Sequence, residues 1–144
     1  GDDRFYNNIF MHSSGLSEYD QKNSFPIFMK GNLFLKNAKS LKKYEKNPQH
    51  DYNADIRFNI DKNINEYFLN INLNKDWSEN KKRSVVDTKI LGKTKITKQF
   101  FEDRNGEKIT INNDYHGKLR NQNNPMPGPF SFKESLNKLK VWPK

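Results

Sequence analysis

The clearest pattern along the chain is a strict alternation of apolar and polar residues in its middle. Apolar side chains occupy every second position over residues 56–60 and again over residues 69–73. A period of two is typical of a β-strand with one apolar face. The intervening Lys62 to Glu66 has the composition of a turn. The sequence therefore predicts an antiparallel hairpin with one apolar face and one asparagine-rich polar face.

Several shorter apolar runs are separated by turn residues and also predict strands. They cover residues 4–11, 25–29 and 33–35 before the hairpin, and 84–86, 99–102, 108–111 and 140–142 after it, whereas residues 90–96 form a broken apolar segment. Pro26 suits an edge position, because proline cannot donate to a strand ladder. Asn105-Gly106 favours a tight hairpin turn, since both residues tolerate a positive φ. We expect about seven to nine short strands.

Two segments interrupt this strand pattern. Residues 36–54 are polar and predict a long loop, with a helical turn near Leu41 to Tyr44. Ser131 is followed three residues later by Glu134, which is the spacing of a helix capping box, so we expect a short helix over residues 131–139. Together the patterns predict an all-β chain: one antiparallel β-sandwich domain over residues 1–144, with a long loop and a short C-terminal helix.

The composition excludes several classes of protein for this chain. The chain has 144 residues, a net charge of +9 and no cysteine, so disulfides and thiolate metal sites are excluded. No apolar run approaches the roughly 18 residues of a membrane helix, and no membrane partner is expected. The charge is concentrated in residues 73–144, where 16 Lys+Arg face 8 Asp+Glu, but only five of the 26 basic residues are Arg. A nucleic-acid partner is therefore an alternative that the sequence does not favour.

No catalytic motif is assembled in the sequence. The three histidines are far apart, phosphate-binding glycine loops are missing, and we predict no metal ligand, no cofactor and no catalytic residue. A glycosidase needs two carboxylates across a cleft. Asp114, beside Tyr115 in a polar turn, is the candidate for a small stand-alone glycoside hydrolase. The competing interpretation, which we favour, is that Asp114 accepts hydrogen bonds from its own loop backbone.

Aromatic side chains in polar surroundings are candidates for sugar contacts, because pyranose rings stack on them. Trp77, Tyr115 and Trp142 fit this description. An equally good interpretation is that each ring closes one end of the core.

Three strings carry a resemblance to a known family. Residues 4–10 read RFYNNIF, residues 114–120 read DYHGKLR, and residues 127–130 read PGPF. In this order they resemble the C-terminal region of secreted right-handed parallel β-helix glycoside hydrolases of the β-xylosidase-like kind, from Bacteroidetes. The resemblance spans nearly the whole chain.

The resemblance implies a non-catalytic accessory β-sandwich domain of a carbohydrate-active enzyme, with the catalytic carboxylates on an upstream β-helix of the same parent chain. Arg4–Met11 would be the remnant of its last coil. The domain would pack on that β-helix or contact a polysaccharide or oligosaccharide. Its carbohydrate contacts would then come from Trp77, Asp114, Tyr115, Arg120 and Trp142. The parent protein would be secreted or periplasmic.

Overall fold

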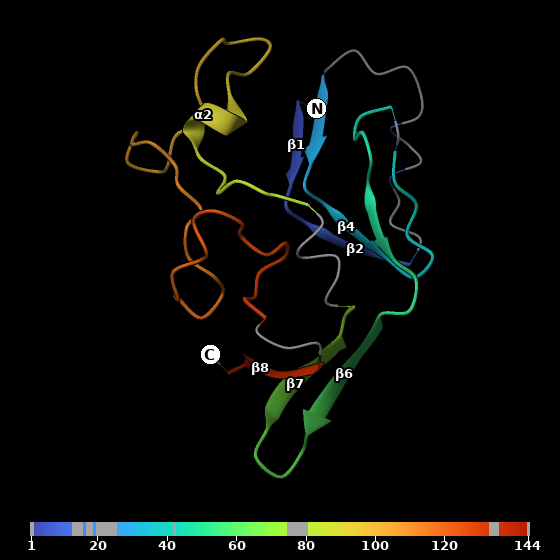
Figure 1. Cartoon of the computed structure of the whole chain (residues 1–144). Coiled ribbons are helices and arrows are strands. Elements are labelled where there is room, and N and C mark those ends of the chain that lie inside the picture. Colours follow the sequence, from blue (N-terminus) through green and yellow to red (C-terminus); the bar gives the residue numbers. More distant parts are fainter. Residues whose placement is uncertain are drawn as a thin grey trace.

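The computed structural model describes residues 2–12, 16, 19, 26–41, 43–74, 81–132 and 136–143. This part of the chain is all-β and sandwich-like, as predicted, with three small sheets and one short helix, α2 (Thr88–Leu91). Figure 1 shows the first strands (blue to cyan) beside the loops around α2, with the hairpin of residues 55–72 (green) below them. Among the described residues, no helix has the length and apolar character that crossing a membrane requires.

The first five strands pair in parallel. One sheet joins β1 to β3, and a second has the order β2-β4-β5. We call these two sheets the parallel stack. Their bounds are β1 (Asp3–Tyr6), β2 (Ile9–Met11), β3 (Ile27–Lys30), β4 (Leu33–Leu35) and β5 (Gln49–Asp51). The predicted antiparallel pairing is therefore wrong for this half of the chain. The predicted long loop contains the unexpected strand β5, which is polar and has no apolar alternation.

The parallel stack repeats one unit, a strand, a corner and a second strand. Asp3 pairs with Ile27 and Ile9 pairs with Leu33, an offset of 24 residues in both cases. The predicted single strand over residues 4–11 is broken at its corner by Asn7, whose φ is 54°. Asparagine tolerates this left-handed conformation better than other non-glycine residues. Gly31, at the equivalent corner one unit later, has a φ of 74°.

The third sheet has the order β6-β7-β8 and is antiparallel. It contains β6 (Asp55–Asp61), β7 (Glu66–Asn72) and β8 (Leu136–Trp142). The first two strands confirm the predicted hairpin, and the last confirms the predicted strand at residues 140–142. The predicted C-terminal helix is wrong over residues 136–139, because these residues pair with β7. Glu134 of the expected capping box lies outside the described residues.

Two apolar clusters hold these layers together. One fills the interior of the parallel stack, where Phe10, Phe34 and His50 on neighbouring strands stack with ring centroids 5.2 and 5.4 Å apart. The other lies between the opposite face of β2 and β4 and the third sheet, and includes Leu33, Leu35, Ile71 and Phe130. Side chains of β4 are buried on both faces, as expected for a central parallel strand.

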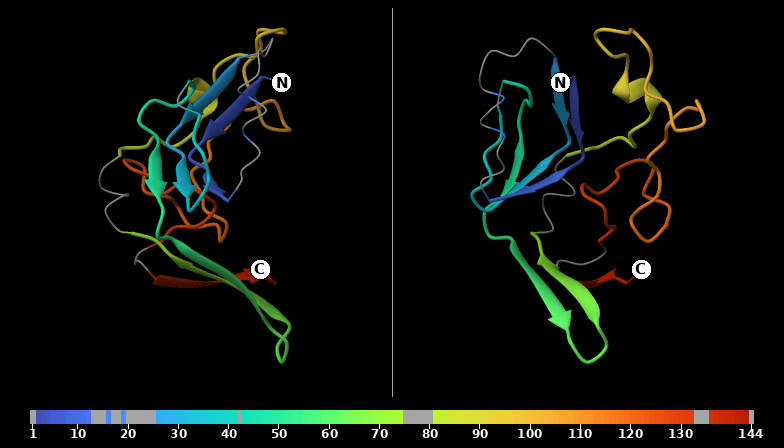
Figure 2. Two further views of the ribbon diagram at one scale, coloured as in Figure 1. Left: turned by 90° about the vertical axis from the view of Figure 1, so that its right-hand side faces the viewer. Right: turned by 180° about the vertical axis from the view of Figure 1, so that it is seen from behind.

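Residues 81–132 form long connections with little regular structure. The expected strand at 84–86 does not form, and the expected strands around Asn105-Gly106 are reduced to isolated bridges such as Glu102 with Lys108. Figure 2 shows these connections lying along the parallel stack, seen from two further directions. They meet its outer face at Arg4, whose guanidinium donates to the carbonyls of Leu91 and Lys93.

Candidate functional site

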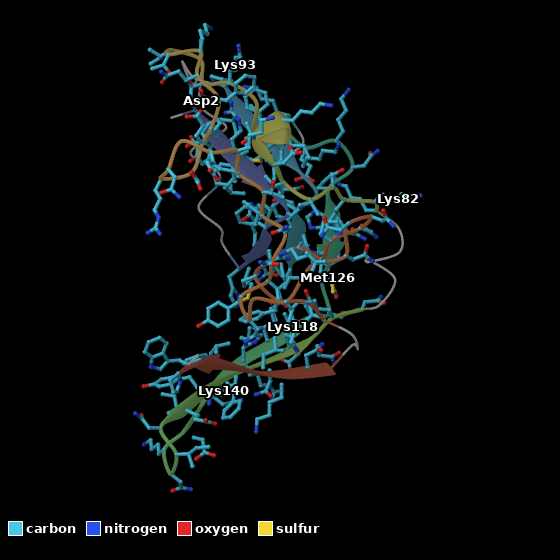
Figure 3. The ribbon with its side chains drawn as sticks, turned by 90° about the vertical axis from the view of Figure 1, so that its left-hand side faces the viewer. Asp2, Lys82, Lys93, Lys118, Met126 and Lys140 are labelled. Carbon is cyan, nitrogen blue, oxygen red and sulfur yellow. The ribbon has the colours of Figure 1, made fainter. Side chains whose placement is uncertain are left out.

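A cavity lies where the connections meet the first corner of the parallel stack. It has a volume of about 520 Å³. Figure 3 labels Met126, which lines the cavity, between the parallel stack and the third sheet. The walls are mostly apolar. The lining residues are Tyr6, Asn7, Asn8, Ile9, Val85, Val86, Ile111, Asn113, Asp114, Tyr115, Arg120, Pro125, Met126, Gly128 and Pro129.

Asp114 lies in the wall of this cavity, and its carboxylate is used by its own loop. Its Oδ1 accepts hydrogen bonds from the backbone N–H groups of His116 and Lys118, both at 2.9 Å. Partial burial opposes ionisation, but these N–H groups, the Ser131 hydroxyl and the charge of His116 together hold the pKa of Asp114 below its ordinary value. The carboxylate is therefore ionised at neutral pH and cannot serve as a general acid.

Arg120 and Tyr115 tie the same loop to its neighbours. The buried Arg120 guanidinium donates to the carbonyls of Asn113, Met126 and Gly128 at 3.0 to 3.1 Å. Burial lowers the pKa of Arg120, against the opposing attraction of Asp114. The Tyr115 hydroxyl donates to the carbonyl of Val141 in β8 at 2.7 Å, and its ring packs edge-on against Phe130. These contacts give the loop of residues 113–130 a fixed conformation.

The two tryptophans proposed as sugar contacts are not part of this cavity. Trp142 ends β8, is 60% exposed, and is the register partner of Tyr67. Trp142 does not line the cavity. The carbonyl of the neighbouring Val141 accepts a hydrogen bond from the Tyr115 hydroxyl. Trp77 lies outside the described residues. The structure thus brings together three of the five candidates, Asp114, Tyr115 and Arg120, and leaves Trp142 on a separate surface.

A polar ladder runs along the corners of the parallel stack, and the sequence reasoning missed it. We call its members, Asn8, Asn32 and Glu45, the corner ladder. Asn8 N donates to Asn32 Oδ1 at 2.9 Å and Asn8 Nδ2 donates to the same atom at 3.3 Å. Asn32 N and Nδ2 in turn donate to Glu45 Oε1 and Oε2, at 3.1 and 2.7 Å. The 24-residue spacing of the two asparagines is the signal that could have revealed it.

Glu45 and Arg83 close the ladder at its far end. The Glu45 carboxylate is buried and receives the Lys81 ammonium at 3.2 Å. Arg83 is also buried, and it donates to the Gly31 carbonyl at 2.8 Å and to Gln49 Oε1 at 2.9 Å. Burial lowers the pKa of Arg83 to about 10, against the opposing attraction of Glu45, so the guanidinium stays protonated at neutral pH.

This arrangement bears on the alternatives that the sequence left open. Arg4, Arg83 and Arg120 all direct their guanidinium groups at backbone carbonyls within the fold. These three guanidinium groups therefore stabilise the fold itself, and the nucleic-acid alternative stays a prediction. Among the described residues, no group of three or more His, Asp or Glu side chains has a geometry that could hold a metal ion.

Comparison with known proteins yields one informative structure. The sequence matches no protein-family model and no curated protein. A solved structure of XylC in complex with xylose resembles this chain with a TM-score of 0.77 and 25% sequence identity. The match covers 99% of this chain and 26% of the XylC chain, so this chain spans about a quarter of the length of that protein. The fold described above is thus similar to one part of a longer, xylose-binding protein.

Proposed function

We propose that this chain is a non-catalytic accessory β-domain of a carbohydrate-active enzyme, and that it packs on a catalytic parallel β-helix. The observation that carries the proposal is the similarity to XylC, solved with xylose, over 99% of this chain and only 26% of that one. A fold that forms one quarter of a sugar-binding protein fits an accessory role. The sugar class indicated by that comparison is xylose and its oligomers.

The parallel stack supports the β-helix part of the proposal. Strands that bend at a corner and pair in parallel at a constant offset of 24 residues have the geometry of successive helical coils. An aromatic stack inside and an asparagine ladder at the corner are typical of such coils, where identical positions lie one above another. We therefore infer that strands β1 to β5 belong to the last coils of a β-helix.

The large cavity supports an accessory rather than a catalytic role. Among the described residues that line it, Asp114 is the one carboxylate, and its Oδ1 is occupied by two backbone donors. Glycoside hydrolysis by either common mechanism needs a second carboxylate, about 5 to 10 Å from the first. Asp114, Tyr115 and Arg120 instead stabilise the loop of residues 113–130, which contacts both the parallel stack and the third sheet.

The test has two arms. The isolated chain is incubated with aryl xylosides, and titrated calorimetrically with xylose, xylo-oligosaccharides, arabinan and pectin fragments. We expect no hydrolysis, and binding heat with xylo-oligosaccharides if the domain contacts substrate directly. Hydrolysis that disappears in Asp114→Asn would overturn the accessory role and establish the glycosidase alternative.

The coding sequence upstream of Asp2 provides a second test. We expect it to encode further parallel coils that carry paired carboxylates, behind an export signal, since we also propose a secreted or periplasmic parent protein. An upstream region of another fold class would refute the packing on a β-helix.

A further inference from the structure

Within the parallel stack, β5 and β3 lie at one side, where β3 also has no further described strand partner, and β1 and β2 lie at the other. Its far edge, β5, is polar, with Gln49 bonded to Arg83 and Asp51 accepting the N–H groups of Asn53 and Asn74. Its near edges are β1 and β2, and no described strand pairs with their outer sides. An apolar edge strand with unpaired peptide groups is one that natural proteins normally cover.

The side chains of β2 are less buried than those of β4. Met11 is 39% exposed, whereas its register partner on β4, Leu35, is 0% exposed. Phe10 is half-buried, and its register partner Phe34 is fully buried. The side chains of β4 are covered because strands lie on both sides of it. One more strand beside β2 would cover Met11 and Phe10 in the same way.

The corner ladder is open at the same end. In each of its two steps, the backbone N–H and the side-chain amide of one corner residue donate to the side-chain oxygen of the next. Glu45 ends the series, because a carboxylate accepts but cannot donate. At the other end, no described residue donates to Oδ1 of Asn8. That oxygen has the position of an acceptor for a preceding corner asparagine.

The third sheet extends beyond this open edge. In the left view of Figure 2 it begins below β5, passes below β4 and β2, and continues past β2 toward the hairpin turn. Near the core its apolar face carries Ile56 and Ile71, which pack on the second cluster. Farther along, Phe58 and Ile60 are exposed. These two, with Tyr67 and Trp142, form a surface that we call the overhang.

We propose that β1, β2 and the overhang together form the docking surface for one further coil of parallel strands, with an asparagine at its corner. The new strands would pair in parallel with β1 and β2, the corner would donate to Asn8, and the overhang would cover the outer apolar face of the strand beside β2. This inference rests on the β-helix part of the proposed function and specifies its contact. The greater length of XylC, most of which lies outside the match, provides room for such coils.

The composition of the overhang favours a protein strand over a sugar. Phe58 and Ile60 offer no hydrogen bonds, and the stacked rings of Phe58 and Tyr67 lie 5.7 Å apart. Sugar sites surround an aromatic platform with polar groups for the hydroxyls. An apolar β-strand face needs only apolar area, which this surface supplies.

The experiment adds the proposed coil. A copy of residues 3–26, which is one 24-residue unit, is fused before Asp3 in a Trp77→Phe background, so that Trp142 is the single tryptophan. The matched control carries the same 24 residues in shuffled order. Acrylamide quenching reports the exposure of Trp142, and hydrogen exchange reports the β1 and β2 amides. Exchange at Ile71, in the core, reports whether each protein is folded.

We expect the fused coil to lower the quenching constant of Trp142 about threefold, as its exposed fraction falls from 60% toward about a fifth, and to slow exchange in β1 and β2. The shuffled extension should do neither. A folded fusion with unchanged quenching would overturn the proposal. If the fusion fails to fold, the same 24 residues are added as a separate peptide. In that case, unchanged hydrogen exchange of the β2 amides overturns the docking proposal.

Xylohexaose added to the unfused Trp77→Phe chain tests whether carbohydrate, rather than a further coil, occupies the overhang. Shielding of Trp142 by this sugar would assign the overhang to carbohydrate and overturn the docking proposal. Failure of the fusion experiment would leave the sugar proposal intact, because calorimetry on the isolated chain does not require a further coil.

Discussion

Removing the central side chain of the corner ladder should destabilise the protein strongly. Asn32 is fully buried, and its side chain holds three neighbours at once. It donates to the Phe5 carbonyl at 2.8 Å and to Glu45 Oε2 at 2.7 Å, and it accepts from Asn8 N at 2.9 Å. Asn32→Ala leaves these groups buried without that partner.

The size of the effect follows from the chemistry of each lost hydrogen bond. Two neutral bonds contribute about 1 kcal/mol each, and the bond to the Glu45 carboxylate about 2 kcal/mol, so the expected loss is about 4 kcal/mol. This is a large share of the roughly 5–15 kcal/mol by which such domains are stable. Asn8→Ala, at the open end of the ladder, removes only the 3.3 Å side-chain bond and should cost less than about 1 kcal/mol.

Urea denaturation followed by circular dichroism and fluorescence measures these differences in the free energy of unfolding. Equal m-values for variant and wild type indicate that the folded and unfolded states keep their compactness. The matched control is Asn59→Ala, because Asn59 is exposed on β6 and a surface change of this kind stays within about 0.5 kcal/mol. An Asn32→Ala variant that loses no more stability than Asn59→Ala would refute the view that the corner ladder stabilises the parallel stack.

Three further predictions use the same denaturation assay. Gly31→Ala should cost at least about 1 kcal/mol more stability than Gly106→Ala. Both glycines have a positive φ, but of the two only Gly31 would place the new Cβ 2.3 Å from Asn7 Oδ1. Equal losses of stability in the two variants would contradict this. Asp114→Asn should be less stable than the wild type at neutral pH. Its deficit should shrink as the pH falls below about 4, since a lowered carboxyl pKa stabilises the fold only while the group is ionised; a constant deficit would contradict the role of the charge. Tyr115→Phe should cost about 1 kcal/mol of stability with an unchanged circular dichroism spectrum, because one hydrogen bond to β8 is lost. Unchanged stability would show that hydration of the hydroxyl by water in the unfolded chain is as favourable as this hydrogen bond.

The candidate site illustrates how far sequence reasoning about function reached. The interpretation of Asp114 as the acceptor of its own loop is confirmed by two backbone hydrogen bonds. The proximity of Asp114 to Arg120 follows from a short loop, which the sequence makes visible. That Trp142 lies outside the cavity could not be predicted, since β8 reaches its position only by pairing with β7.

By itself, the sequence determined the elements that depend on local periodicity. The β6–β7 hairpin follows from alternating apolar residues, and the β4 strand from three consecutive apolar residues. A period of two places side chains on faces regardless of the partner strand, which is why these predictions held. The same reasoning misassigned residues 136–139, where local capping chemistry favoured a helix and pairing with β7 imposed a strand.

Only the tertiary structure decided which strands pair and in which direction. Parallel neighbours in the stack are separated by 24 residues at β1–β3 and β2–β4 and by 16 at β4–β5, and no local pattern encodes such offsets. The corner ladder exists because this pairing stacks Asn8 on Asn32, and the overhang exists because the third sheet runs past β2 (Figure 2). Both depend on contacts between residues distant in sequence, which is why composition and periodicity gave the class of the fold but not its open edge.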